Sequence, residues 1–279
     1  MNRRDFLAGA ATGVATAGVI GIAGRGLMSR PADGQPAAAG AKAAPVPDPA
    51  APPKAAAPVA GQYKGRVSFA QQGEDLILYN LLRHAMGIEN PSYIDIGAGD
   101  PVLSNNTYAL YLTGSRGVLV EPNPTLVKAL KTVRPEDVVV NAGVGVTDSG
   151  AADYYVIRDQ WPLNTFSPED VAAIRKRYKE DPVEKVIKMP LIQINRLLAD
   201  HFTTAPDLMS IDIEGMDFDV LSALDLTAHR PAAICAETKK PWASHEESPI
   251  ATLLESHGYV ACAGSLYNTI FGDRQRFRM

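Results

Sequence analysis

The residues with the clearest chemical potential follow two short apolar segments. Asp95, Gly97 and Gly99 end the first of them, within the sequence Asp-Ile-Gly-Ala-Gly-Asp. Glycines at such a turn let the backbone approach a ligand closely, and the start of a following helix offers amide donors. Glu121 ends the next apolar segment, 26 residues after Asp95, where a carboxylate can accept both hydroxyls of a ribose. The combination predicts nucleoside binding, with a purely structural glycine turn as the alternative.

The glycine turn departs from the fingerprint of dinucleotide-binding proteins. Pro101 and Val102 follow Asp100, so the full three-glycine pattern is absent. Because that pattern cradles a pyrophosphate, which S-adenosylmethionine lacks, the sequence favours S-adenosylmethionine over NAD. Asn141 and Ala142 follow the third apolar segment, where an amide and the backbone would meet an adenine. A turn-forming Asn is an equal alternative there.

A second group of acids lies at the end of a later apolar segment. Ser210, Asp212 and Glu214 alternate along it, so they share one side of a strand. Two carboxylates at the end of an apolar strand are costly unless they meet a partner, a metal or a substrate. Alternatively, Glu214 has no chemical role and only begins the next helix, where a negative charge is favourable. Asp212 and Glu214 are candidates for a divalent ion such as Mg²⁺, but their spacing alone establishes no metal site.

Two further residues are candidates for acid–base chemistry. Glu237 ends the next apolar segment, and His245 follows it. A hydroxyl nucleophile needs a base at such a position, and Asp212 is the first choice, ahead of Glu237 and His245. Walker A, His-Glu-x-x-His and Gly-x-Ser-x-Gly sequences are absent, which argues against P-loop, zincin and nucleophile-elbow chemistry.

The elements that must position these residues alternate between strands and helices. Strands separated by helices predict βαβ units and a mainly parallel sheet. The nearly continuous apolar strands indicate a sheet that is covered on both faces, and the closely joined last two strands must be antiparallel. The strands are expected at residues 92–97, 117–121, 137–141, 153–157, 185–189, 207–213, 232–237, 259–263 and 268–271. The helices are expected at residues 71–86, 104–113, 124–132, 168–179, 218–224 and 248–257.

Composition divides the chain into a basic N-terminal part and an acidic remainder. The chain has 279 residues, of which 46% are hydrophobic and 21% charged, which is typical of a globular protein. Residues 1–61 have a net charge of +3 and the remainder a net charge of −7. An acidic main domain argues against a nucleic-acid partner. With only two cysteines, a disulfide framework is excluded.

The first 61 residues read as targeting and linker segments. Arg3 and Arg4 precede Asp-Phe-Leu and a Gly- and Ala-rich apolar run, so residues 1–30 resemble a twin-arginine export signal. The alternative is a buried or membrane-spanning helix. Residues 31–61 contain 8 Pro and 13 Ala, which predicts a disordered linker, and residues 62–279 are expected to fold. A used signal makes the export machinery a partner of the chain and the periplasm its location. If the signal stays uncleaved, it tethers the protein to the inner membrane. If the signal is not used, the protein stays in the cytoplasm.

A series of short motifs resembles one known family in order and content. The series covers Phe69–Leu76, Ile94–Ala98, Ser104–Tyr111, Val120–Pro124, Leu163–Ser167, Ser210–Gly215 and Ala236–Thr238. It resembles the FkbM family of S-adenosylmethionine-dependent methyltransferases across residues 68–271. The resemblance implies a Rossmann-like class I methyltransferase fold, with a mainly parallel seven-stranded sheet, helices on both faces and a C-terminal β-hairpin.

The resemblance also implies a reaction and a set of roles. The reaction is O-methylation, often of a sugar hydroxyl in a glycan or another small-molecule acceptor. Asp95 and the segment Gly97-Ala98-Gly99 would line the methionine end of the cofactor, and Glu121 would hold its ribose. Asn141 and Ala142 would lie near adenine, with Asp212 and Glu214 on the substrate side. The alternative function is an exported, catalytically degenerate domain that binds a saccharide or a protein.

Overall fold

The computed structural model describes residues 66–147, 150–213, 215–238 and 248–278. The predicted export signal and linker lie outside these residues, and so do Glu214 and His245. Within the described ranges, no helix is both long and apolar enough to span a membrane.

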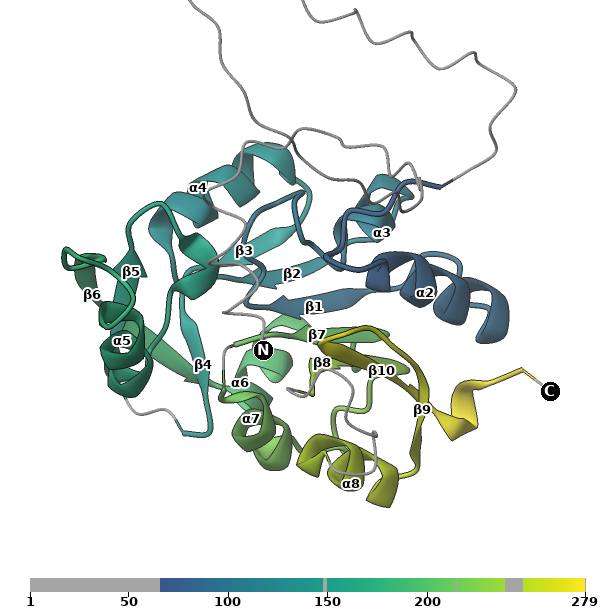
Figure 1. The fold of residues 1–279 in the computed structure, drawn as a ribbon. Coiled ribbons are helices and arrows are strands. Elements are labelled where there is room, and N and C mark those ends of the chain that lie inside the picture. Colours follow the sequence, from purple (N-terminus) through teal and green to yellow (C-terminus); the bar gives the residue numbers. More distant parts are fainter. Residues whose placement is uncertain (1–65, 148–149, 214, 239–247, 279) are drawn as a thin grey trace, which may run out of the picture. The chain divides into compact units, whose positions relative to one another are not determined.

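A seven-stranded sheet forms the centre of the fold (Figure 1). Its strand order is β3-β2-β1-β7-β8-β10-β9, and β10 is antiparallel to both of its neighbours while the remaining pairs are parallel. The predicted mainly parallel sheet with a terminal antiparallel hairpin is therefore confirmed. The strands are β1 (Tyr93–Ile96), β2 (Gly117–Val120), β3 (Val138–Val140), β7 (Leu208–Ile211), β8 (Ala233–Glu237), β9 (Tyr259–Gly264) and β10 (Asn268–Asp273).

The register of the three central strands brings their carboxyl ends together. Ile96 on β1 pairs with Val120 on β2 and with Ile211 on β7. The chain runs outward from β1 in one direction through β2 and β3, then returns to β7 on the other side. Open α/β sheets bind ligands at such a reversal of strand order. The residues that follow these strands, among them Glu121 and Asp212, therefore meet at one edge of the sheet.

Alternation along the strands builds a core on each face of the sheet. Ile94 and Ile96 pack with α6, α7 and α8 on one face, whereas Tyr93 packs with α2, α3 and α4 on the other. Because neighbouring side chains of a strand point to opposite faces, Asp95 lies on the same face as Tyr93. The helices are α2 (Glu74–Asn80), which continues as the π-helix η1 (Leu81–Ala85), α3 (Tyr108–Leu112), α4 (Pro124–Val133), α5 (Pro168–Arg175), α6 (Ile194–His201), α7 (Asp217–Ala223) and α8 (Pro249–Ser256).

A small second sheet is inserted between β3 and β7, and Figure 1 shows it beside the main sheet with α5. It contains β4 (Gly143–Gly145), β6 (Val183–Gln193) and β5 (Ala151–Ile157) in that order. The segments 153–157 and 185–189 were expected to be strands, but they pair with each other rather than join the main sheet. Strand β4 was not expected. Its Gly-Val-Gly sequence has no strand pattern of its own, and it forms a strand by pairing with β6.

Helix boundaries differ from the expected ones where the backbone is left-handed. The helix expected from residue 104 begins at Tyr108; Ser104 has a φ of 55°, and the Asn105 side-chain oxygen accepts the N–H groups of Thr107 and Tyr108. The helix expected from residue 71 begins at Glu74, after Gly73 with a φ of 92°. Helix α6 was not expected, although Ile194, Leu197 and Leu198 are buried at helical spacing.

Candidate cofactor-binding site

A pocket of about 570 Å³ opens at the carboxyl edge of the sheet. An adjoining hollow of about 300 Å³ shares Gly97, Pro122, Phe166 and Ile213 with it and adds Ala142. The pocket lies between the loops that follow β1, β2 and β7 and the inserted segment. Its lining residues are Gly97, Gly99, Glu121, Pro122, Leu126, Tyr154, Trp161, Pro162, Asn164, Thr165, Phe166, Asp212 and Ile213.

The turn after β1 strongly favours glycine. Gly97 and Gly99 have φ angles of 81° and 62°, a left-handed region that side chains disfavour. A Cβ on Gly97 would lie 2.1 Å from the backbone oxygen of Asp212, and one on Gly99 would lie 2.7 Å from the Trp161 ring. The turn therefore presents bare backbone to the pocket, which fits the predicted close approach of a cofactor.

Glu121 is buried at the base of the pocket, with 4% of its surface exposed. One carboxylate oxygen accepts the Gly99 N–H at 2.9 Å, and the other accepts the Asn123 N–H at 2.7 Å. Burial raises the pKa of Glu121 to about 7, the two amide bonds lower it, and the nearby Asp95 carboxylate raises it. A carboxylate oxygen that accepts one hydrogen bond has room for another, so the group fits the two hydroxyls of a ribose.

The two residues expected near adenine take different positions. Ala142 lines the adjoining hollow. The Asn141 side chain instead donates from Nδ2 to the backbone oxygens of Glu121 and Pro122, both at 2.9 Å. Asn141 thus supports the loop after β2.

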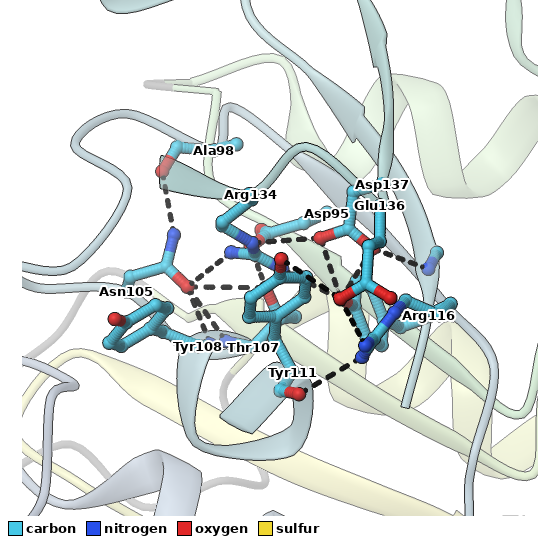
Figure 2. A network of polar contacts seen from close by, with 12 residues as sticks. Asp95, Ala98, Asn105, Thr107, Tyr108, Tyr111, Arg116, Arg134, Glu136 and Asp137 are labelled. Carbon is cyan, nitrogen blue, oxygen red and sulfur yellow. Dashed lines mark hydrogen bonds and ion pairs between the residues drawn. The ribbon is translucent and has the colours of Figure 1, made fainter. Parts of the chain in front are cut away.

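Asp95 and Ala98 are buried outside the lining of the pocket. Asp95 does not line the pocket; it is buried and accepts the Thr107 hydroxyl at 2.7 Å (Figure 2). Burial raises the pKa of Asp95, while the Thr107 bond and the Arg134 charge lower it. Ala98 is buried, and its N–H donates to the oxygen of Val120 at 3.1 Å.

The acids predicted for catalysis lie around two separate hollows. Asp212 lines the main pocket, whereas Glu237 lines a hollow of about 330 Å³ together with Asp217, Phe218 and Ser248. Burial and the charge of Asp212 raise the pKa of Asp217 to about 6, although backbone hydrogen bonds lower it. Glu214 and His245 cannot be placed, since they are outside the described ranges. Among the described residues, no group of three His, Cys, Asp or Glu side chains could hold a metal ion.

An aromatic wall of the pocket was not predicted. Tyr154, Trp161 and Phe166 reach it from β5, from the 3₁₀ helix η2 (Trp161–Leu163) and from the segment that follows. The motif Leu163–Ser167 contributed to the family resemblance, but nothing in its residue types indicated a ligand. Of these residues, Trp161 lies against the glycine turn at Gly99, and all three line the same pocket as that turn.

The strand order, the antiparallel last strand and the acid facing a glycine turn are those of a Rossmann-like methyltransferase fold. The chain belongs to the methyltransferase FkbM domain family, which it matches over residues 95–261. No curated protein matches the chain.

Three solved structures are similar to the chain at low identity. The FkbM methyltransferase of Methylobacillus flagellatus is 15% identical with a TM-score of 0.35; the match covers 66% of this chain and 44% of that one, less than half its length. The TehB-like SAM-dependent methyltransferase of Corynebacterium glutamicum is 12% identical, with coverages of 73% and 89% and a TM-score of 0.37. The precorrin-6y C5,15-methyltransferase of Geobacter metallireducens is 16% identical, with coverages of 71% and 86% and a TM-score of 0.37.

Proposed function

We propose that the chain binds S-adenosylmethionine in the main pocket and methylates a hydroxyl of a sugar or glycan. The buried Glu121 beside the Gly97–Gly99 turn carries the proposal, because it combines a ribose acceptor with bare backbone. Glu121 would hold the ribose, the turn would face the methionine part, and Ala142 would lie against the adenine. When bound, the cofactor supplies an electrophilic methyl group on a sulfonium, so the protein mainly orients the reactants.

The acceptor side of the proposal rests on the second set of acids. A sugar hydroxyl is a weak nucleophile, and a positioned carboxylate can take its proton during transfer. Asp212 lines the cofactor pocket and is the proposed base. Glu237 and the half-exposed ring of Phe218 share the separate hollow, where a carboxylate and an aromatic face suit hydroxyls and the apolar face of a sugar.

The proposed cofactor site is tested by calorimetric titration of the full chain with S-adenosylmethionine, with and without Mg²⁺. Glu121→Ala removes both proposed ribose contacts, so the Kd should rise roughly a hundredfold or more, as expected for two hydrogen bonds to a charged group. Glu255→Ala, an exposed acid on α8, is the matched control and should leave the Kd unchanged. A folded wild type that does not bind S-adenosylmethionine would overturn the proposal.

The location of the protein is a second part of the proposal. We propose that the twin-arginine segment at Arg3 and Arg4 directs export, so that the folded domain works outside the cytoplasm. The alternative function, a degenerate domain that binds a saccharide or a protein, predicts a different outcome. In that case, Glu121→Ala leaves glycan binding unchanged and S-adenosylmethionine binds to neither variant.

A further inference from the structure

A buried network of polar side chains lies beside the glycine turn, and Figure 2 shows Arg134 at its centre. The Arg134 side chain has no exposed surface. Its guanidinium donates to Asp137 at 2.8 Å, to the Tyr93 hydroxyl at 2.9 Å, and to Thr107 Oγ1 and Asn105 Oδ1 at 3.0 Å each. A fully buried guanidinium is costly unless it is paired and hydrogen-bonded, and these four bonds meet that requirement.

The network determines which way the Asn105 side chain points. Because Arg134 can only donate, the amide atom that faces it must be the oxygen. The same oxygen also accepts the backbone N–H groups of Thr107 at 3.0 Å and Tyr108 at 2.8 Å. The amide nitrogen is thereby turned toward the glycine turn, where it donates to the backbone oxygens of Ala98 at 3.0 Å and Asp100 at 3.2 Å.

One peptide group connects this amide to the cofactor site. The oxygen of the Ala98–Gly99 peptide accepts from Asn105, and the N–H of the same peptide donates to Glu121 at 2.9 Å. In a trans peptide these two ends point in opposite directions, so both bonds hold the same orientation. Accepting a hydrogen bond at the oxygen also strengthens the donor at the N–H. Gly99 has no side chain to oppose rotation of this peptide, so the bonds must keep it in place.

We propose that Asn105 is a positioning residue for cofactor binding. It holds the Ala98–Gly99 peptide so that the N–H points at Glu121, and Arg134 fixes the orientation of the Asn105 amide. The inference rests on the proposed function, since Glu121 is the residue proposed to hold the ribose. Asn105 thus acts on the cofactor through the backbone and through Glu121, without lining the pocket itself.

The substitution Asn105→Asp tests this role with almost no change in shape. The new carboxylate keeps a partner in Arg134 but places an oxygen against the backbone oxygens of Ala98 and Asp100. The two hydrogen bonds that hold the turn are therefore lost. The Kd for S-adenosylmethionine should rise roughly tenfold or more, as expected when a hydrogen bond to a charged group is weakened. Asn105→Ser should show the same effect without an added charge, and it decides the matter if the Asp variant does not fold.

The pH dependence of S-adenosylmethionine binding distinguishes a positioning role from a merely structural one, because loss of a structural contact alone would not change it. The Gly99 N–H lowers the pKa of Glu121, so losing its orientation should raise the pH midpoint of S-adenosylmethionine binding in Asn105→Ser. The other ionisable groups that face Glu121 are Asp95 on β1 and Tyr154 on β5, and both are unchanged in this variant.

Tyr93→Phe is the matched control within the same network. It removes a hydroxyl that bonds to Arg134 and Asp137, so it should lower the unfolding temperature but leave the Kd and the pH midpoint at wild-type values. If Tyr93→Phe weakens binding as much as the Asn105 variants do, or if those variants bind like the wild type, the inference is overturned while the proposed function stands. A folded wild type that does not bind S-adenosylmethionine overturns both.

Discussion

Glu121 illustrates how opposing forces act on one carboxylate. Burial favours its neutral form, while the N–H groups of Gly99 and Asn123 favour the charged form, and the result is a pKa of about 7 in place of the ordinary 4.5. The unfolded chain releases this proton at a lower pH than the folded chain. The free energy of unfolding therefore falls as the pH rises from about 4.5 to about 7, and the loss is complete above that value.

We expect Glu121→Gln to remove this contribution. Between pH 5 and pH 8, the wild type should lose about 2–3 kcal/mol of its free energy of unfolding through the shifted pKa of Glu121. The variant should not show this loss, because Gln does not titrate. Urea denaturation of both proteins at the two pH values measures the difference. Asp217, whose pKa burial raises to about 6, stays in both proteins and serves as the common background. A difference that does not change with pH would contradict the prediction.

At the scale of elements, the inserted sheet turns a common strand edge into a particular pocket. The main sheet supplies the glycine turn, Glu121 and Asp212, whereas β5, η2 and the following segment supply the aromatic wall. The expected strands and the expected acids were sufficient to predict the first part. The second part depends on the pairing of β5 with β6, which directs Trp161 onto the backbone at Gly99.

Trp161→Ala should therefore weaken binding more than it weakens the fold. Its half-buried ring contacts the glycine turn and lines the pocket, so the Kd for S-adenosylmethionine should rise roughly tenfold, in line with the burial energy of an aromatic side chain. Tyr178→Ala, an exposed aromatic outside the pocket, is the control. Equal Kd values for the wild type and Trp161→Ala would show that the wall does not contact the cofactor.

At the scale of the whole molecule, export and catalysis make different demands. S-adenosylmethionine is made in the cytoplasm, so a methyltransferase that works outside must acquire it before or after transport. The chain places a net charge of +3 in its first 61 residues and −7 in the remainder, so the proposed targeting segment differs in charge from the acidic remainder. Whether the segment is used therefore determines where the reaction can occur.

A reporter fused after residue 61 tests the targeting segment directly. The reporter should be exported, and replacing both Arg3 and Arg4 by lysine should abolish export, because the pathway reads the arginine pair and not its charge. Measuring the reporter in the periplasmic and cytoplasmic fractions gives the answer. A reporter that stays in the cytoplasm would remove the export proposal and leave the cofactor site unaffected.

The sequence by itself determined the family, the alternation of strands and helices, the glycine turn and the acid after β2. These features are local: each follows from residue types within a few positions and from the alternation of apolar segments. Polar residues at the ends of apolar segments also marked the positions after β1, β2 and β7, because open α/β sheets bind ligands beyond the carboxyl ends of their strands.

Only the tertiary structure decided which side chains surround the pocket and which support it. It placed Asp95 beside the turn, kept Glu237 in a separate hollow, and brought Trp161 onto Gly99. It also joined Arg134 to Asn105, 29 residues earlier in the chain. Such contacts depend on how distant segments pack and on which polar groups must find partners once buried, and no pattern of neighbouring residues contains that information.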